Sequence, residues 1–264
     1  MSINNQINSG STDQAWEAWG QKDPYFGVIT NQKFRRTELT KETKAEFFES
    51  GRLHAEYVMQ MIHQYIDPTF QAQKALDFGC GVGRLIVPLA KMVASVMGAD
   101  VSPSMLLEAE RNCVEADLQN VRLVQSDDAL SALDERFDFI HSFIVFQHIP
   151  PQRGREIFAA LLARLDAGGV GAVHFAYSKD HYAPTHGLPP VPAVITDDPA
   201  KTEAEAVAQD PNADPEMQMN PYHLNELFFL LQINGVHRFH TEFTDHGGEL
   251  GVFLYFQKPR GKPG

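Results

Sequence analysis

Apolar and polar positions alternate with two different periods between Lys74 and Asp166. The runs with strand character are KALDF, SVMGAD, VRLVQSD and FDFIHSFIVF. The segments with helical spacing are RLIVPLAKMVA, PSMLLEAERNCVEA and PQRGREIFAALLARL. Strands that alternate with helices are typical of a parallel sheet with helices on both faces. The sequence therefore predicts a doubly wound α/β fold.

The pattern continues with the strand GGVGAVHFAY, the helix PYHLNELFFLLQIN and a closing run that contains HTEFTDHGGELGVFLYF. That closing run reads as two strands joined at DHGG, which is a hairpin signal. A terminal antiparallel hairpin can extend an otherwise parallel sheet. We expect a mostly parallel seven-stranded sheet whose last strand is antiparallel.

Two segments lie outside this pattern. Residues 1–70 contain the amphipathic run from Glu38 to Ile66, and we expect an N-terminal arm and lid helices here, ahead of the α/β domain of residues 71–264. Residues 178–220 form an insertion rich in Pro, Ala and acidic residues. A loop of this length inside a compact domain is usually functional or disordered, so it covers the site or keeps a mobile loop in solution.

Composition narrows the class of protein. The chain of 264 residues has no apolar run long enough to span a membrane, and its polar start lacks a signal-peptide core, which favours a cytoplasmic protein without a membrane partner. Its net charge of -12 opposes binding to a polyanion, so nucleic acid is a poor partner. Two cysteines are too few for a disulfide framework.

The turn after the first strand, in ALDFGCGVGR, contains Gly79, Gly81 and Gly83. Ligands of open parallel sheets bind at this turn, and glycine permits the backbone to approach them closely. A dinucleotide loop has the spacing G-x-G-x-x-G, whereas here the third glycine comes one position early and Arg84 stands in its place. The spacing weakens an NAD-binding interpretation.

The stretch LDFGCGVGR resembles the first motif of the class I S-adenosylmethionine-dependent methyltransferases, and the resemblance extends over roughly Phe70 to Lys258. It implies an acid at the end of the second strand for the ribose hydroxyls, matched by Asp100 in MGADVSPSML. It implies another at the end of the third strand near the adenine, matched by Asp127 in LVQSDDAL, with the adjacent Asp128 as a helix N-cap. S-adenosyl-L-methionine is the implied cofactor.

Further residues have roles under this resemblance. Asp77 accepts hydrogen bonds from the loop amides or from the ammonium of the ligand, or it only holds the turn. Cys80 presents its backbone to the ligand, and Val101 and Phe143 complete the expected cofactor contacts at strand ends.

Two histidines are candidates for the methyl-transfer step. His148 in FIVFQHIPP follows the fourth strand, where the acceptor binds in this family, and acts as a base, orients the acceptor or only packs. His246 in TDHGGELG lies in the terminal turn, on the cofactor edge because the sixth strand runs parallel to the others, with Asp245 as its orienting partner. A plain hairpin turn explains the same residues. The remaining histidines show no compact metal-ligand pattern, so we expect no metal.

Four residues near the loop have competing interpretations. Tyr25 and Phe26 close over the methionine end of the cofactor or anchor the N-terminal arm. Arg52, which follows a Ser-Gly break between helices, pairs with the methionine carboxylate or is an exposed helix-start residue. Arg84 is expected at the surface or in a structural role rather than against a ligand.

The sequence thus favours a methyltransferase acting on an oxygen or nitrogen atom of a small-molecule or sugar-like acceptor. It lacks the D/N-P-P-Y motif of amino-methylating nucleic-acid enzymes. Two alternatives stay open: an NAD-dependent oxidoreductase, and a non-catalytic module that binds the cofactor for regulation.

Overall fold

The computed structural model describes residues 9–179 and 214–260. Seven strands form one sheet in the order β3-β2-β1-β4-β5-β7-β6. They are β1 (Lys74–Phe78), β2 (Ser95–Asp100), β3 (Val121–Gln125), β4 (Phe137–Ser142), β5 (Leu165–Lys179), β6 (Phe239–Asp245) and β7 (Glu249–Gln257). Strands β1 to β5 run parallel, and β7 is antiparallel to both β5 and β6. The predicted sheet, including its antiparallel last strand, is confirmed.

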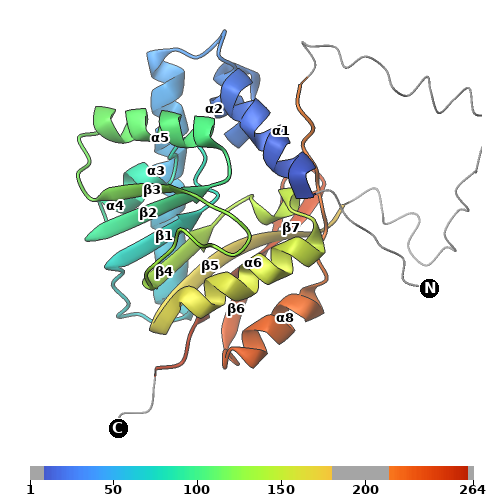
Figure 1. The fold of residues 1–264 in the computed structure, drawn as a ribbon. Coiled ribbons are helices and arrows are strands. Elements are labelled where there is room, and N and C mark those ends of the chain that lie inside the picture. The colour runs from blue at the N-terminus through green and yellow to red at the C-terminus, as the bar shows by residue number, and fades with distance from the viewer. Residues whose placement is uncertain (1–8, 180–213, 261–264) are drawn as a thin grey trace, which may run out of the picture.

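Helices surround the sheet, and α1 and α2 lie beside one edge of it (Figure 1). The helices are α1 (Ser9–Lys22), α2 (Pro24–Val28), α3 (Lys41–Tyr65), α4 (Ile86–Ala90), α5 (Pro103–Glu115), α6 (Pro151–Arg164) and α8 (Leu224–Ile233). Two short 3-10 turns are η1 (Gln32–Phe34) and η2 (Phe146–His148). Among the described residues, no helix has the length and apolar character needed to cross a bilayer.

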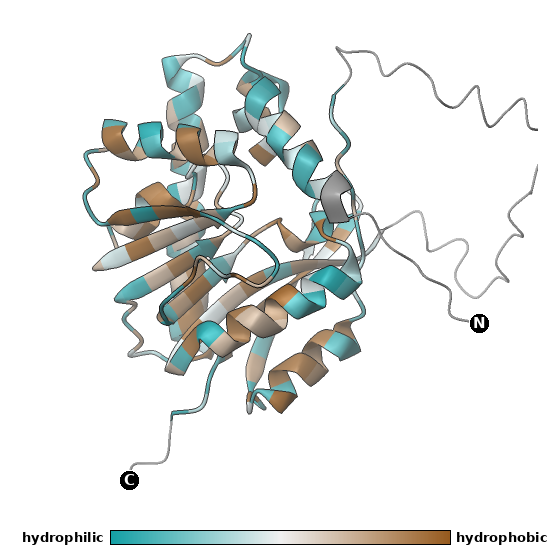
Figure 2. Ribbon diagram, in the orientation of Figure 1, coloured by the Kyte–Doolittle hydropathy of each residue, from teal (hydrophilic) through white to brown (hydrophobic). Residues whose placement is uncertain are grey.

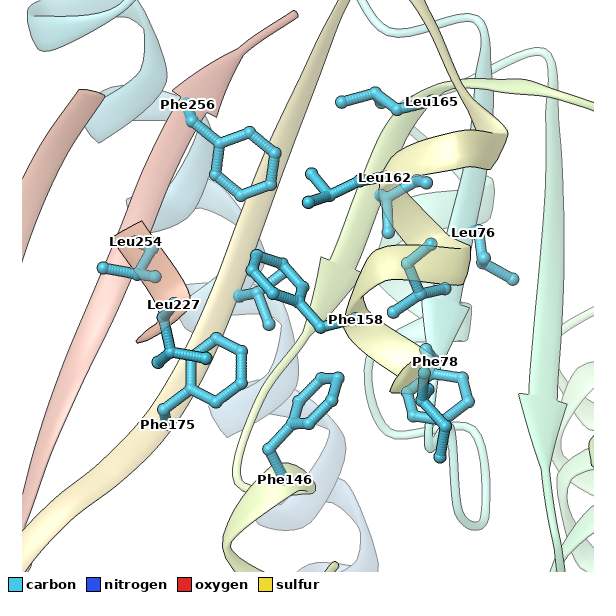
Figure 3. Close-up of a cluster of buried hydrophobic side chains, with 14 of the residues drawn as sticks. Leu76, Phe78, Phe146, Phe158, Leu162, Leu165, Phe175, Leu227, Leu254 and Phe256 are labelled. Carbon is cyan, nitrogen blue, oxygen red and sulfur yellow. The ribbon is translucent and has the colours of Figure 1, made fainter. Parts of the chain in front are cut away.

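Each face of the sheet has its own hydrophobic core. Strand β1 contributes to both, because Ala75 packs with residues of α3 and α4 while Leu76 packs with residues of α6 and α8. The second core contains a group of phenylalanines that includes Phe158 and Phe175 (Figure 3). This alternation of buried residues is what a parallel strand covered on both sides requires. It leaves the carboxyl ends of the strands as the edge where a ligand can bind.

Local signals start the helices next to that edge. Thr40 and Thr43 form a capping box at the start of α3. Ser102 caps α5 by accepting a hydrogen bond from the Met105 amide, and Pro103 occupies the first turn. The chain therefore passes from Asp100, the last residue of β2, almost directly into the capped first turn of α5.

The N-terminal segment has a small core of its own, formed by Trp19, Tyr25, Phe26, Phe34, Phe47, Val82 and Met105. Helix α1 is largely hydrophilic, whereas the strands are predominantly hydrophobic (Figure 2). The side chain of Glu17 in α1 accepts hydrogen bonds from Ser102 and Ser104 at the start of α5. These bonds hold α1 against the edge where β2 ends.

Helix α3 corrects one expectation. It runs unbroken from Lys41 to Tyr65, so the predicted break at Ser50 and Gly51 is wrong. Gly51 is needed there for packing, because a Cβ at this position would lie 2.2 Å from the carbonyl oxygen of Arg84. Most of the acidic insertion, residues 180–213, lies outside the described residues.

Candidate active site

A cavity of about 560 Å³ lies at the carboxyl ends of the parallel strands. Its wall includes Gly79 and Gly81 after β1, Asp100 at the end of β2, Val101 after it, and Phe143 after β4. Its volume is in the range of pockets that hold small molecules. Together with Asp127 and Asp128, seven of the predicted cofactor contacts are thus brought together in one cavity wall.

The glycine loop has the left-handed backbone conformation for which its three glycines are suited. Gly79, Gly81 and Gly83 have φ values of 74°, 52° and 85°, in the left-handed region that favours glycine. A Cβ on Gly79 would lie 2.3 Å from the side chain of Val145, so no larger residue fits there. Gly83 faces Ala109 of α5 instead of the cavity, and its role in cofactor binding stays a prediction.

Two backbone amides, one of them in the glycine loop, hold the carboxylate of Asp100 in place. Its Oδ2 accepts a hydrogen bond from the Gly81 amide at 2.8 Å, and its Oδ1 accepts one from the Ser102 amide at 2.9 Å. Burial raises the pKa of Asp100 to about 6, against the lowering effect of these two bonds. Each oxygen keeps a second lone pair, so the carboxylate can accept paired hydroxyls.

Asp77 and Cys80 lie behind the cavity wall. Asp77 is 2% exposed, and its Oδ1 accepts a hydrogen bond from Nδ1 of His141 at 2.8 Å. Its Oδ2 is buried without a hydrogen-bond partner. The Cys80 thiol, whose pKa is raised above all by burial, packs beside Gly98 of β2. The contact of either residue with the cofactor stays a prediction.

The two acids after β3 have different partners. Asp127 accepts a hydrogen bond from the Ser131 amide at 2.8 Å, whereas Asp128 forms an ion pair with Arg153 of α6. The expectation that Asp128 caps a helix is therefore wrong, because only turns follow β3 and Asp127 closes the first of them. Both acids line the cavity, as does Ser126, whose buried hydroxyl has no partner.

His148 lies in η2 and is buried at 5% exposure in the cavity wall. Its Nδ1 donates to the carbonyl oxygen of Gln218 at 2.7 Å, and its ring lies 4.8 Å from that of Trp16. Burial lowers the pKa of His148 to about 4, although the bond to Gln218 opposes this. The ring is therefore neutral at pH 7, with its lone pair on Nε2.

His246 also lines the cavity, at the turn between β6 and β7. The prediction that this turn lies on the cofactor edge is confirmed, because β6 runs parallel to β5. Asp245 does not act as expected: its Oδ1 accepts the Gly248 amide at 2.7 Å and so closes the turn. The imidazole of His246 lies 6.0 Å from the Phe143 ring, between centroids.

Of the two arginines near the loop, Arg84 departs from the sequence interpretation, whereas the interpretation of Arg52 as an exposed residue is confirmed. Arg84 is buried at 8% exposure and lines the cavity, although a surface position was expected. Arg52 is exposed and pairs with Glu49 and Glu56 on the outer side of α3. Arg84 is buried because α3 packs across it. The sequence around Arg84 does not indicate this tertiary contact.

The interpretation of Tyr25 and Phe26 as anchors of the N-terminal arm is confirmed. Both are buried in the N-terminal core, and the Tyr25 hydroxyl bonds to Glu108 and Asn112 of α5. The arm reaches the cavity through other residues that sequence analysis did not single out. They are Thr12, Asp13 and Trp16 of α1 and Gly27, Val28, Ile29 and Thr30.

Two comparisons with known proteins agree with this geometry. Residues 75–169 match the methyltransferase domain family. Residues 75–169 therefore form a methyltransferase domain. The ubiquinone biosynthesis O-methyltransferase of Cereibacter sphaeroides is 36% identical to it over 84 residues, which are 30% of this chain and 32% of that protein. The corresponding enzyme of Dinoroseobacter shibae is 31% identical over 121 residues, 44% and 46% of the two chains. The chain thus spans less than half the length of these curated relatives.

Solved structures show the same fold. The magnesium protoporphyrin IX methyltransferase of Synechocystis, solved with bound S-adenosylhomocysteine, has a TM-score of 0.61 at 17% identity, covering 94% of this chain and 99% of that chain. The N-methyltransferase NodS of Bradyrhizobium japonicum has a TM-score of 0.57 at 13% identity, and the match covers 95% of this chain and 100% of that chain. At these identities the likeness shows the fold alone.

The residues of the cavity fit S-adenosylmethionine. Gly79 and Gly81 line the cavity without side chains, and Asp100 has free lone pairs for the ribose hydroxyls. The partnerless hydroxyl of Ser126 lines the region where the adenine is expected. Within residues 9–179 and 214–260, no group of three or more His, Cys, Asp or Glu side chains is arranged to hold a metal ion.

Proposed function

We propose that the methyltransferase moves the methyl group of S-adenosylmethionine to a hydroxyl oxygen of a small, largely apolar acceptor. The observation that carries the proposal is the buried imidazole of His148 in the cavity wall. Because Nδ1 donates to the Gln218 carbonyl, Nε2 is left as a hydrogen-bond acceptor. Its one polar neighbour in the described chain is the Gln147 amide nitrogen, at 3.5 Å, the long limit of a hydrogen bond. A hydroxyl nucleophile needs such an acceptor because it loses its proton during transfer.

Bound S-adenosylmethionine supplies an activated methyl group that the nucleophile displaces in line. The protein then has to align the two reacting atoms and exclude water, and alignment alone accounts for a large part of such rate enhancements. The glycine loop and Asp100 position the cofactor, and His148 orients the hydroxyl group of the acceptor.

The low pKa of His148 is compatible with this task. The acceptor hydroxyl becomes strongly acidic as its bond to carbon forms, so a base with a pKa of about 4 suffices to take the proton at that stage. The neutral ring is ready at pH 7 without a prior deprotonation step. After transfer, His148 releases the proton to water.

The acceptor end of the cavity is apolar. Trp16 lies against His148, and the side chains of Met217 and Met219 line the same cavity. Aromatic and thioether side chains suit a flat, apolar molecule. The names of the Cereibacter and Dinoroseobacter relatives point to oxygen as the methylated atom, which supports the same class.

Nucleic acid fits less well as an acceptor. One relative, the 23S rRNA (uracil(1939)-C(5))-methyltransferase RlmD of Shewanella frigidimarina, is 33% identical over 78 residues, but these are only 17% of that protein. The net charge of -12 disfavours a polyanion. The proposal is therefore a small-molecule acceptor.

The test measures S-adenosylhomocysteine released from S-adenosylmethionine with panels of phenols, catechols and aliphatic amines. We expect turnover with hydroxyl acceptors, and a loss of about 10²- to 10⁴-fold in kcat for His148→Phe, which keeps a ring beside Trp16 but removes the lone pair. The Kd of S-adenosylhomocysteine should not change. His223→Gln, an exposed histidine at the start of α8, is the matched control.

Two results would contradict the proposal. Turnover with amines alone would assign the transfer to nitrogen. Cofactor binding without turnover of any acceptor in a wide panel would favour the non-catalytic module.

A further inference from the structure

Strand β6 forms one edge of the sheet and is 7 residues long. Within residues 9–179 and 214–260, only β7 pairs with it, so the outer row of its backbone N–H and C=O groups has no strand partner. An edge of this kind is a template for another strand, and natural proteins often protect it with lysine, proline or a bulge. The sequence of β6, FHTEFTD, has neither lysine nor proline, and its register with β7 is unbroken. The edge is thus open to strand addition.

Exposed apolar side chains accompany this edge. Phe243 of β6 is 61% exposed. Helix α8 packs on β6 through the rings of Phe228 and Phe239, and Figure 2 shows that α8 is mostly hydrophobic. Two further side chains of α8, Phe229 and Ile233, lie one turn apart and are 62% and 75% exposed. Apolar side chains that gather at an open edge are typical of a protein–protein interface.

The sequence of β6 is complementary to itself in the antiparallel direction. When two copies pair about Thr241, each residue lies opposite the residue that is equally far from Thr241 in the partner, and both side chains point to the same face. We call this pairing the central register. His240 then lies opposite the partner's Glu242. An imidazole N–H thus meets a carboxylate twice, once on each side of a two-fold axis.

The other face of the strand matches as well. In the central register, Phe239 lies opposite the partner's Phe243, and an aromatic pair across two strands is stabilising. His237, which comes just before β6, lies opposite the partner's Asp245, the last residue of the strand. Both faces of the strand therefore gain complementary pairs.

A shift of the register by two residues loses this complementarity. Pairing about Phe239 places His240 opposite the partner's Arg238. Pairing about Phe243 places His240 opposite the partner's His246. Neither shifted register brings a basic side chain of β6 opposite an acidic one of β6. A one-residue shift would turn paired side chains to opposite faces of the sheet. The central register is therefore favoured.

Helix α3 holds the polar pair in position. Tyr65 stacks on His240 at 3.9 Å between ring centroids, and Tyr57 donates a hydrogen bond to the Glu242 carboxylate. Side chains that are ordered before association lose less conformational entropy when they meet a partner.

We propose that the protein forms a two-fold symmetric dimer through β6, with the two sheets joined into one. The partner is thus a second copy of this chain. Because the two-fold axis stands perpendicular to the sheet, the two α8 helices lie on one face of it and the two α3 helices on the other. The inference does not rest on the proposed function, because no residue of β6 lines the cavity.

The first experiment measures the mass of the full chain by sedimentation velocity across micromolar concentrations. We expect a dimer for the wild type. Phe243→Lys should raise its dissociation constant by about 100-fold, because lysine at a strand edge opposes pairing and each dimer contains the change twice. Since Phe243 is largely exposed, the variant should keep the circular dichroism of the wild type. Val114→Lys is the matched control, because Val114 is 73% exposed on α5, which packs beside β3 at the opposite edge.

The second experiment tests the register with two charge variants. His240→Glu places two carboxylates opposite each other in its own dimer, and Glu242→Lys places two basic side chains opposite each other. Each variant alone should be largely monomeric where the wild type is dimeric. An equimolar mixture should recover the dimer, because the introduced glutamate of one chain then meets the introduced lysine of the other.

The third experiment uses the two-fold axis. In the central register, Thr241 lies opposite its own copy, within the Cα separation that a disulfide spans. Thr241→Cys should therefore form a disulfide between two chains when oxidised glutathione is added, whereas Val114→Cys should not. The chain's own cysteines, Cys80 and Cys113, are buried.

Three results would contradict the dimer. A wild type that stays monomeric at every concentration excludes a second copy as the partner of β6. A dimer that persists in Phe243→Lys has its interface elsewhere. A mixture of charge variants that does not associate, together with no disulfide in Thr241→Cys, excludes the central register. None of these results bears on methyl transfer, which the variants of His148 test.

Discussion

Asp77 and His141 are register partners on the neighbouring strands β1 and β4, and Nδ1 of His141 donates to Oδ1 of Asp77 over 2.8 Å. On its other side, Nε2 of His141 lies 3.1 Å from Nε2 of His54 in α3. Burial, and then the proximity of His141, lowers the pKa of His54 to about 2, so His54 is neutral at working pH. The carboxylate before the glycine loop is thus held by a chain of two imidazoles.

This chain predicts a positioning role for His141. His141→Leu should leave an oxygen of Asp77 without a donor, which costs about 1–3 kcal/mol of stability. It should also raise KM for S-adenosylmethionine while kcat at saturating cofactor stays nearly unchanged, because Asp77 is misplaced and the acceptor side is not. Steady-state kinetics and thermal unfolding of the same variant provide both values.

Two further variants separate positioning from simple packing. His141→Gln keeps an N–H donor and should recover most of the KM. His54→Phe keeps the ring stacked on Phe143, now 4.0 Å between centroids, and removes only the outer bond. If His54→Phe raises KM as much as His141→Leu does, the hydrogen bond from His141 to Asp77 does not explain the increase in KM.

Asp100 predicts a pH dependence of cofactor binding. Burial raises its pKa to about 6, and only the ionised carboxylate can accept both ribose hydroxyls. The affinity for S-adenosylhomocysteine should therefore rise as pH rises through about 6, with roughly a tenfold loss per pH unit below that value. Calorimetry between pH 5 and 8 measures this slope.

The same shift has a consequence for the protein without ligand. Because the folded pKa lies above the ordinary value of 3.8, the folded state binds this proton more tightly than the unfolded chain does. The contribution of Asp100 to the free energy of unfolding should fall as pH rises from about 4 to about 6. Asp100→Asn should weaken binding at every pH and abolish the slope. Asp127→Asn should keep the slope, since hydrogen bonds from Ser131 lower the pKa of Asp127.

The fold could be predicted from the sequence because hydrophobic residues recur with one period in the strands and with another in the helices. Runs such as KALDF and SVMGAD can be buried on both faces only as central parallel strands, and β1 and β2 are these strands. Positions at strand ends were predictable for the same reason. Asp100 and His246 reach the cavity because Asp100 ends β2 and His246 directly follows β6, and both strands point to that edge.

Residues placed by tertiary packing were not predictable in this way. Arg84 is buried by the close approach of α3 at Gly51, and Trp16 reaches His148 from a helix more than a hundred residues earlier in the chain. The failed helix cap at Asp128 is a similar case. The pattern SDDAL reads as a helix start, but the chain forms turns there and Asp128 pairs with Arg153 of α6.

Arg153 predicts how the cavity opens. It bonds to both oxygens of Asp128 and, through its two terminal nitrogens, to Asp13 of α1 at 2.8 Å each. We propose that α1 is the lid expected from the sequence and that this link holds it closed. Arg153→Met should speed the release of S-adenosylhomocysteine about 5- to 30-fold, as loss of a partly buried ion pair of about 1–2 kcal/mol implies. Stopped-flow fluorescence of Trp16, in the cavity wall, measures the rate.

A neighbouring arginine provides the control for this lid. Arg155 lies on the same helix but pairs with Glu226 of α8. Arg155→Met should leave the release rate unchanged, and high salt should speed release from the wild type but not from Arg153→Met. Equal release rates for both variants and the wild type would show that α1 does not limit release.

Gly51 predicts a reversal of the usual effect of alanine in a helix. Glycine to alanine in an open helix position normally stabilises by up to about 1 kcal/mol. In α3, the added Cβ would lie 2.2 Å from the carbonyl oxygen of Arg84, so we expect Gly51→Ala to lower the free energy of unfolding by about 1–3 kcal/mol. Leu53→Ala, at a side chain 53% exposed on the same helix, should change it by less than about 0.5 kcal/mol. A variant that is stabilised would show that the helix has room at this position.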